Sequence, residues 1–238
     1  MDQNREISVV IPVFNEEKVI LSCLDSLSKQ TLLPKEVIIV NNCSTDNTKD
    51  KAINFRNKCS SLNIRIVEEA KKGIKYARQK GFEESRGEVI AMTDADALFP
   101  KDWLAVGSRI FDSKYDVIAG WCDFEFNNKF FRKFSGIINR FFLKYSKYLT
   151  GYQKFLGATV FFKKDTLVKI GGYLKNTENI PEDIYIAKQI HKKRLSIKFD
   201  KDLFIYHSIR RTEEGGIKGL VKWILGWVNH SYYEEKDS

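Results

Sequence analysis

The sequence lacks the features that mark several common classes of protein. Its 238 residues include only four cysteines, Cys23, Cys43, Cys59 and Cys122, and no two of them have the spacing of a zinc site or a disulfide framework. No apolar run is long enough to cross a bilayer, and the charged N-terminus leads directly into a strand-like segment. We therefore expect no membrane span and no signal peptide, and we predict a cytoplasmic protein with reduced thiols.

Glycine-rich phosphate loops are also missing. The sequence has no Gly-x-Gly-x-x-Gly fingerprint and no loop that ends in Gly-Lys-Ser/Thr, which argues against the usual nicotinamide and ATP enzymes. A hydrophobic content of 43% and a charged content of 30% are typical of an ordinary globular protein. The length suffices for one large or two small domains.

Acidic residues are absent from one long segment. Residues 126–164 contain no Asp or Glu but nine Lys or Arg, and the whole chain carries a net charge of +9. Apolar residues recur at intervals of three or four from Phe130 to Tyr148, which predicts a basic amphipathic helix over about 129–149. Such a helix can lie on an anionic membrane surface, or it can pack on its own domain with a solvated basic back.

Apolar strand-like segments alternate with helical patterns in the first hundred residues. Strands are predicted at 6–12, 36–40, 64–67 and 89–92, and helices at 17–30, from Thr48 onward, and at 73–85. This alternation is typical of an α/β fold with a mostly parallel central sheet flanked by helices. Further strands are predicted at 117–121, 157–162, 196–199 and 203–206, and a further helix at 182–193.

Two pairs of acidic residues lie at predicted boundaries, one at the end of a strand and one at the start of a helix. Asp94 and Asp96 lie just after the strand at 89–92, so in an extended segment they point the same way and could share a divalent cation. An ordinary acidic turn explains them equally well from the local sequence. Glu182 and Asp183 occupy the first turn of a predicted helix, where the helix dipole favours acids without any catalytic role.

Taken in order, these motifs resemble the family-2 glycosyltransferases, which are mostly inverting enzymes of the GT-A fold that use nucleotide-diphosphate sugars. The resemblance covers roughly residues 6–207. Its motifs are the first strand and loop at 9–16, the second loop at 40–48, Gly73 with Ala77–Gly81, Asp94-Ala95-Asp96, and Glu182-Asp183.

The resemblance implies a domain organisation and a set of roles. A GT-A domain would span 1–210, with a nucleotide-sugar-binding half at 1–98 and an acceptor-binding half at 99–210; residues 211–238 would form an amphipathic helix and tail. Asp183, beside Glu182, would be the catalytic base. Asp96, Asp94 and His207 would hold Mg²⁺ or Mn²⁺. The donor would be bound by Pro12, Val13, Phe14, Glu16, Asn41, Asn42, Asp46, Arg78, Asp94, Ala95 and Asp96.

The sequence departs from the family pattern in its second loop. Asn41 and Asn42 stand where the family has an acidic pair, so the choice of base is open, with UDP favoured over GDP and dTDP. The Gln-x-x-Arg-Trp motif of processive synthases is absent. We therefore expect transfer of one sugar to a glycan, cell-envelope or lipid-linked acceptor, with no nucleic-acid partner and with peripheral contact to the inner face of the membrane as an option.

Two other functions remain as alternatives. One is a non-catalytic basic module that binds a membrane or nucleic acid, which would leave Asp94, Asp96 and Asp183 unexplained. The other is an Asp-x-Asp phosphohydrolase. It is disfavoured because Leu98 stands where such enzymes carry Thr or Val, and because the motif follows three other strands.

Overall fold

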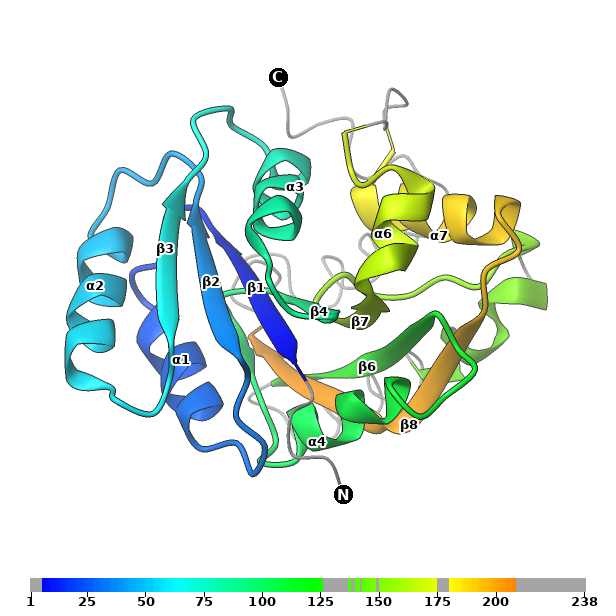
Figure 1. The fold of residues 1–238 in the computed structure, drawn as a ribbon, viewed down its shortest axis with the longest axis horizontal. Coiled ribbons are helices and arrows are strands. Elements are labelled where there is room, and N and C mark those ends of the chain that lie inside the picture. Colours follow the sequence, from blue (N-terminus) through cyan, green and yellow to red (C-terminus); the bar gives the residue numbers. More distant parts are fainter. Residues whose placement is uncertain are drawn as a thin grey trace.

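The computed structural model describes residues 6–125, 150–174 and 180–208, together with residues 137, 140, 141 and 143–148. Its strands form an eight-stranded sheet in the order β3-β2-β1-β4-β7-β6-β8-β5 (Figure 1). The predicted C-terminal helix at 211–238 lies outside the described residues.

The first half of the sheet is parallel. It comprises β1 (Ile7–Val13), β2 (Glu36–Asn41), β3 (Ile64–Glu68) and β4 (Val89–Thr93). The helices that connect them are α1 (Ile20–Ser28), α2 (Thr48–Lys58) and α3 (Ile74–Glu84). The strands β1 and β2 are rich in Val and Ile and are buried along their whole length, as expected for parallel strands covered on both faces.

The second half of the sheet mixes strand directions. It contains β5 (Ala97–Leu98), β6 (Val117–Glu125), β7 (Thr159–Lys163) and β8 (Ile197–Ser208). The strand β7 joins the two halves, because it runs antiparallel to both β4 and β6. The helices of this half in the described residues include α4 (Trp103–Gly107), a 3₁₀ turn (Ser108–Ile110), α6 (Lys164–Ile170) and α7 (Glu182–Lys192), besides the helical segment 143–148.

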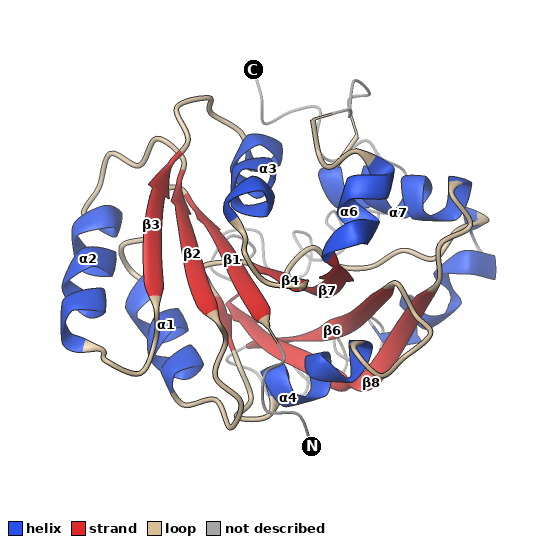
Figure 2. Ribbon diagram, in the orientation of Figure 1, coloured by secondary structure: helices blue, strands red, loops and turns tan. Residues whose placement is uncertain are grey.

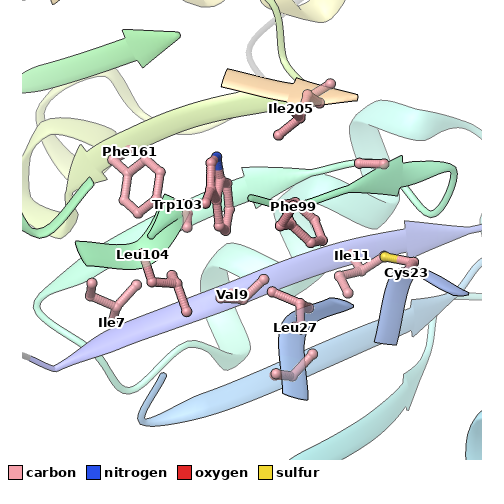
Figure 3. Packing of buried hydrophobic residues seen from close by; sticks show 14 of the residues in the cluster. Ile7, Val9, Ile11, Cys23, Leu27, Phe99, Trp103, Leu104, Phe161 and Ile205 are labelled. Atoms are coloured by element: carbon pink, nitrogen blue, oxygen red, sulfur yellow. The ribbon is translucent and has the colours of Figure 1, made fainter. Parts of the chain in front are cut away.

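Helices cover both faces of the sheet (Figure 2). Alternate residues of β1 enter two different apolar clusters: Val9 and Ile11 pack with residues of α1 and α4, whereas Val10 packs with residues of α3, α6 and α7. The indole of Trp103 anchors the first cluster between the rings of Phe99 and Phe161, at centroid distances of 4.4 and 4.8 Å (Figure 3). These two apolar clusters hold β4 in the sheet, and Asp94 and Asp96 follow directly after that strand.

Most predicted elements are confirmed, with two corrections. The sequence predicts that Pro12 ends the first strand, but β1 continues to Val13. This is possible because pairing with β4 stops at Val10, so Pro12 has only β2 as a neighbour. The two strands predicted at 196–199 and 203–206 are a single strand, β8.

Residues 200–202 inside β8 are all charged, which is typical of a turn, and the sequence therefore predicted two strands there. Between Ala119 and Trp121 of β6, the pairing on β8 jumps from Phe199 to Phe204, so the intervening residues bulge from the ladder. The bulge is closed locally, where the backbone N–H of Asp202 donates to the Asp200 carboxylate at 3.0 Å. The strand therefore continues without interruption to His207.

The predicted basic helix at 129–149 is only partly described. Residues 143–148 are helical, as are 137, 140 and 141, whereas the other residues of that segment lie outside the described part. Ile137, Phe141, Tyr145 and Tyr148 are exposed, whereas Leu143 and Ser146 are buried. Among the described helices, none has the length and hydropathy needed to span a membrane.

The contact between α3 and the sheet gives a stability prediction. A Cβ added to Gly81 would lie 2.1 Å from Cγ1 of Val10, a buried β-branched side chain with little freedom to move. We expect Gly81→Ala to lower the free energy of unfolding by roughly 1–3 kcal/mol, despite the better helix propensity of alanine. Urea denaturation would measure this, with Lys80→Ala on the same helix as control. An unchanged or higher midpoint for Gly81→Ala would contradict it.

Candidate active site

Two carboxylates and an imidazole meet at the end of β4. Asp94 and Asp96 lie in the turn between β4 and β5, and β8 brings His207 opposite Ala97. Nε2 of His207 lies 3.1 Å from Oδ1 of Asp96 and 3.7 Å from Oδ2 of Asp94. One ligand atom from each of these three residues lies within 4.8 Å of the other two, so together they could hold a metal ion.

The charges in this triad perturb one another. Burial alone would lower the pKa of His207, but hydrogen bonds with Asp94 and Asp96 and their negative charges raise it to about 10. Burial would likewise raise the pKa of Asp94, but the hydrogen bond with His207 and the charge of Arg78 hold it well below its usual range. The two carboxylates thus favour the protonated form of His207.

Arg78 of α3 connects this triad to α7. Its guanidinium pairs with Oδ1 of Asp94 at 2.9 Å and with Oε1 of Glu182 at 3.0 Å, and the side chain is only 5% exposed. Burial would lower the pKa of Arg78, but the charges of Glu182 and Asp94 hold it above its usual range. Nε of Arg78 is buried and has no hydrogen-bond partner in the described part of the chain.

The guanidinium of Arg78 needs a glycine beneath it. A Cβ on Gly157, in the loop before β7, would lie 1.9 Å from Nη1 of Arg78 and 2.7 Å from its Cζ. No other residue type fits there while Arg78 keeps both ion pairs. Sequence reasoning missed this role, because nothing local to Gly157 indicates that α3 packs against it.

Glu182 and Asp183 occupy the first turn of α7, as predicted. Glu182 faces Arg78, whereas Oδ1 of Asp183 accepts a hydrogen bond from the N–H of Ile184 at 2.8 Å. The structure therefore brings Asp94, Asp96, Arg78, Glu182 and His207 into one connected group. Asp183 is joined to it through its neighbour in the chain.

The loops after β1 and β2 interlock. The Asp46 carboxylate accepts hydrogen bonds from the N–H of Glu17 and from the N–H and the hydroxyl of Thr48. The Thr48 hydroxyl oxygen in turn accepts from the N–H of Glu16. Asn15 has a left-handed backbone, and its Oδ1 accepts from the N–H of Thr45 at 2.8 Å. The side chain of Asp46 is thus engaged in loop structure, and Glu16 is buried.

Other predicted donor-binding residues of these loops differ in accessibility. Pro12 and Val13 are buried within β1, and Ala95 is buried between the two aspartates, whereas Phe14 is 39% exposed. The ring of Phe14 lies 4.7 Å from Nζ of Lys72. Phe14 is therefore the residue of this group whose side chain is open to a ligand.

The two asparagines play different parts. Asn42 holds the loop before α3: its Nδ2 donates to the carbonyl oxygens of Glu69 and Lys71, and its Oδ1 accepts from the N–H of Gly73. A carboxylate could not make the two donations. Nδ2 of Asn41 donates to Oε2 of Glu68 at 2.8 Å, while its Oδ1 is buried with no hydrogen-bond partner among the described residues.

Comparison with known proteins identifies the family. A family model described as glycosyl transferase family 2 matches residues 8–168, which is more than half of the chain. The chain belongs to glycosyl transferase family 2. The resemblance noted in the sequence is thus confirmed.

Curated relatives match about half of the chain. Glycosyltransferase AglE of Haloferax volcanii is 36% identical over 126 residues, which cover 51% of this chain and 41% of AglE. The poly(ribitol-phosphate) beta-N-acetylglucosaminyltransferase TarS of Staphylococcus aureus is 32% identical over 114 residues, 47% of this chain and 20% of TarS. The matched regions thus span less than half of these relatives.

Solved structures match most of the chain. The mannosyltransferase PcManGT of Pyrobaculum calidifontis, in complex with GDP-Man and Mn²⁺, has a TM-score of 0.68 at 22% identity and covers 94% of this chain and 66% of its own. Residues 1–349 of TarS, in complex with UDP-GlcNAc, also have a TM-score of 0.68 at 22% identity, with coverage of 86% and 59%. These likenesses confirm the GT-A fold.

The raised pKa of His207 gives a prediction for the metal-free protein. Because the folded-state value of about 10 exceeds the ordinary value of 6.5, the protonated histidine stabilises the fold fully below pH 6.5, and this contribution is lost as the pH rises to about 10. With a chelator present, we expect the loss of unfolding free energy in His207→Gln to be largest below pH 6.5. Urea denaturation across this range would test it, with the exposed His191→Gln as control. If the unfolding free energy lost in His207→Gln grew with pH, the raised pKa of His207 would be wrong.

Proposed function

We propose that the protein transfers one sugar from a nucleotide-diphosphate sugar to an acceptor hydroxyl by direct displacement, with inversion at the anomeric carbon. The observation that carries this proposal is the buried bridge Asp94–Arg78–Glu182. It ties the triad that could hold a metal to the helix that carries Asp183. A leaving group could thus be stabilised on one side of the bridge while a proton is removed on the other.

The ligand atoms offered by Asp94, Asp96 and His207 fit Mg²⁺ or Mn²⁺. Two carboxylates and one imidazole leave coordination positions for diphosphate oxygens and water, which both ions accept. A bound ion would neutralise negative charge that develops on the departing diphosphate. Asp96 and Asp94 would hold it with His207, which must lose its proton to become a ligand, so the affinity for metal should rise with pH.

Asp183 is our candidate for the catalytic base. An aspartate is ordinarily ionised at neutral pH, so it can accept the proton of an acceptor hydroxyl without a large perturbation. The attacking oxygen would form its bond to the anomeric carbon as the bond to the diphosphate breaks. Glu182 would keep Asp183 in place through its ion pair with Arg78.

The nucleotide would lie over the interlocked loops, with Phe14 open to its base and Asn41 at the end of β2. Because Nδ2 of Asn41 is engaged by Glu68, its free Oδ1 can act only as an acceptor. Uracil, thymine and guanine each present a ring N–H that an acceptor could bind, whereas cytosine and adenine do not. UDP is the first nucleotide to test, before GDP and dTDP.

Ligand-dependent stabilisation tests the donor and the metal together. We expect Mn²⁺ with a matching sugar nucleotide to raise the melting temperature by about 5–10 °C at a ligand concentration one hundred times the dissociation constant. The panel would contain UDP-GlcNAc, UDP-glucose, GDP-mannose and dTDP-glucose, each with Mn²⁺ and with chelator.

A matched variant makes this test specific. Asp96→Asn should fold and should lose the metal-dependent part of the shift, because an amide is a neutral and weaker metal ligand. Asp102→Asn, on the exposed surface before α4, is the control and should keep the full shift. If no nucleotide of the panel stabilises the wild type in a metal-dependent way, the transferase proposal fails.

The acceptor would be a glycan, a cell-envelope polymer or a lipid-linked sugar, and we propose peripheral contact with the inner face of an anionic membrane. Support comes from the helical segment 143–148 and the residues before it. Phe141 and Tyr148 are 63% and 85% exposed, and Lys144 and Lys147 lie exposed beside them. Exposed aromatic residues flanked by lysines suit the boundary between headgroups and acyl chains.

Vesicle flotation tests the membrane contact. We expect the protein to float with vesicles that contain anionic phosphatidylserine and not with neutral vesicles. The double variant Phe141→Ser/Tyr148→Ser should bind at least about tenfold less tightly, because two exposed aromatic side chains no longer enter the bilayer. Lys58→Gln/Lys101→Gln, which removes two exposed lysines elsewhere, is the control. Equal flotation of the aromatic variant would contradict the assigned surface.

A further inference from the structure

Two consecutive lysines in the loop between β3 and α3 lie against different aromatic rings. Nζ of Lys71 lies 4.2 Å from the centroid of the Tyr76 ring, whereas Nζ of Lys72 lies 4.7 Å from the centroid of the Phe14 ring. Both lysines are exposed. Phe14 directly follows β1, and its ring is where the proposed function places the nucleotide base. The proposed mechanism gives no role to the ammonium group beside that ring.

The backbone that carries Lys72 is fixed against the end of β2. The buried side chain of Asn42 holds the residues on both sides of it: Nδ2 donates to the carbonyl oxygen of Lys71 at 2.8 Å, and Oδ1 accepts from the N–H of Gly73 at 2.7 Å. Gly73 itself has a φ of +134°, a conformation that favours glycine. The side chain of Lys72 therefore extends from a backbone position that the loop does not leave free.

The backbone on either side of Phe14 is fixed as well. The carbonyl oxygen of Val13 accepts from the N–H of Asn42 at 2.9 Å, and Oδ1 of Asn15 accepts from the N–H of Thr45 at 2.8 Å. Phe14 nevertheless remains 39% exposed. Asn42 thus holds both segments, and the meeting of an ammonium group with an open aromatic ring follows from the fold of the two loops.

We propose that Lys72 is a specificity-determining residue for the nucleotide, because its ammonium group donates a hydrogen bond to a carbonyl oxygen of the base that stacks on Phe14. This inference rests on the proposed function. Uracil, thymine and guanine carry a carbonyl oxygen next to their ring N–H, whereas cytosine and adenine carry an amino group at that position. An ammonium group only donates, so it binds the carbonyl oxygen and repels the amino group.

The distance between Lys72 and Phe14 suits this contact. The centroids of offset-stacked rings lie about 4.5–7 Å apart, and Nζ of Lys72 lies 4.7 Å from the Phe14 centroid. A base stacked on Phe14 and the ammonium group therefore lie around the same ring. As the base arrives, the rotatable side chain of Lys72 turns from the ring to the edge of the base, while its backbone stays in place.

Pairs of nucleotides that differ only in the base test the inference. UDP and CDP share the same ribose and diphosphate, as do GDP and ADP, so the ratio of their dissociation constants reports the base alone. Isothermal titration calorimetry with Mn²⁺ would measure this ratio. We expect the wild type to bind UDP at least about tenfold more tightly than CDP, or GDP than ADP if it prefers purines, because a hydrogen bond from a charged donor is lost with the amino base.

Variants of the two lysines make the test specific. Lys72→Met keeps the apolar stem but removes the ammonium group, and it should lower the ratio about tenfold, whereas Lys72→Arg keeps a charged donor and most of the preference. Lys71→Met is the matched control, because it removes the neighbouring exposed lysine, which lies over Tyr76. It should leave the ratio unchanged. If Lys72 acted on the diphosphate instead, Lys72→Met would weaken both members of a pair equally, and the unchanged ratio would overturn the inference.

A measurement without nucleotide decides if Lys72→Met does not fold. In the wild type, the ring current of Phe14 should shift the NMR signals of the Lys72 side-chain methylene groups upfield, and this shift should vanish in Phe14→Leu. The signals of Lys71 should not respond to Phe14→Leu. If the Lys72 signals are the same in Phe14→Leu and in the wild type, the two side chains do not meet in solution and the inference is wrong.

The outcomes separate this inference from the function on which it rests. If none of the four nucleotides binds in the presence of Mn²⁺, the donor site itself is wrong, and the role of Lys72 is overturned with it. If UDP or GDP binds but Lys72→Met discriminates between the bases as well as the wild type does, the donor site stands and only the role of Lys72 is overturned.

Discussion

The guanidinium of Arg78 has to be neutralised where it lies, because an unpaired charge in the protein interior is strongly destabilising. Asp94 and Glu182 neutralise it from two elements that lie far apart in the chain. The close approach of Gly157 adds a third element, since the loop before β7 can reach this position only without a side chain. One buried charge thus joins α3, the end of β4, the approach to β7 and the start of α7, and the geometry of the site follows from it.

The parallel half of the fold could be predicted from the sequence because its strands are short and rich in Val and Ile and they alternate with helical segments. The motif Asp94-Ala95-Asp96 could be placed for the same reason, since the end of a buried strand is visible in the sequence. The prediction was wrong at β8, where Asp200 and Asp202 look like a turn but form a bulge within one strand. Local composition cannot distinguish these two arrangements.

The site could be predicted only in part, and the limit is physical. The resemblance to a family grouped Asp94, Asp96 and His207 in advance, and in the structure the pairing of β5 with β8 brings them together. The engagement of Asp46 by Thr48 and Glu17 was not visible, because a polar loop residue looks the same whether it binds a ligand or another loop. Gly157 was missed because its role depends on packing between distant segments.

The interlocked loops after β1 and β2 have a consequence for association. Their backbone is fixed by hydrogen bonds between the loops, including those made by Asn15 in its left-handed conformation. A ligand that arrives at this edge of the sheet meets groups that are already ordered, so little conformational entropy remains to be lost on binding. The favourable free energy of the ligand contacts then contributes to affinity, because the loops lost their conformational entropy when the protein folded.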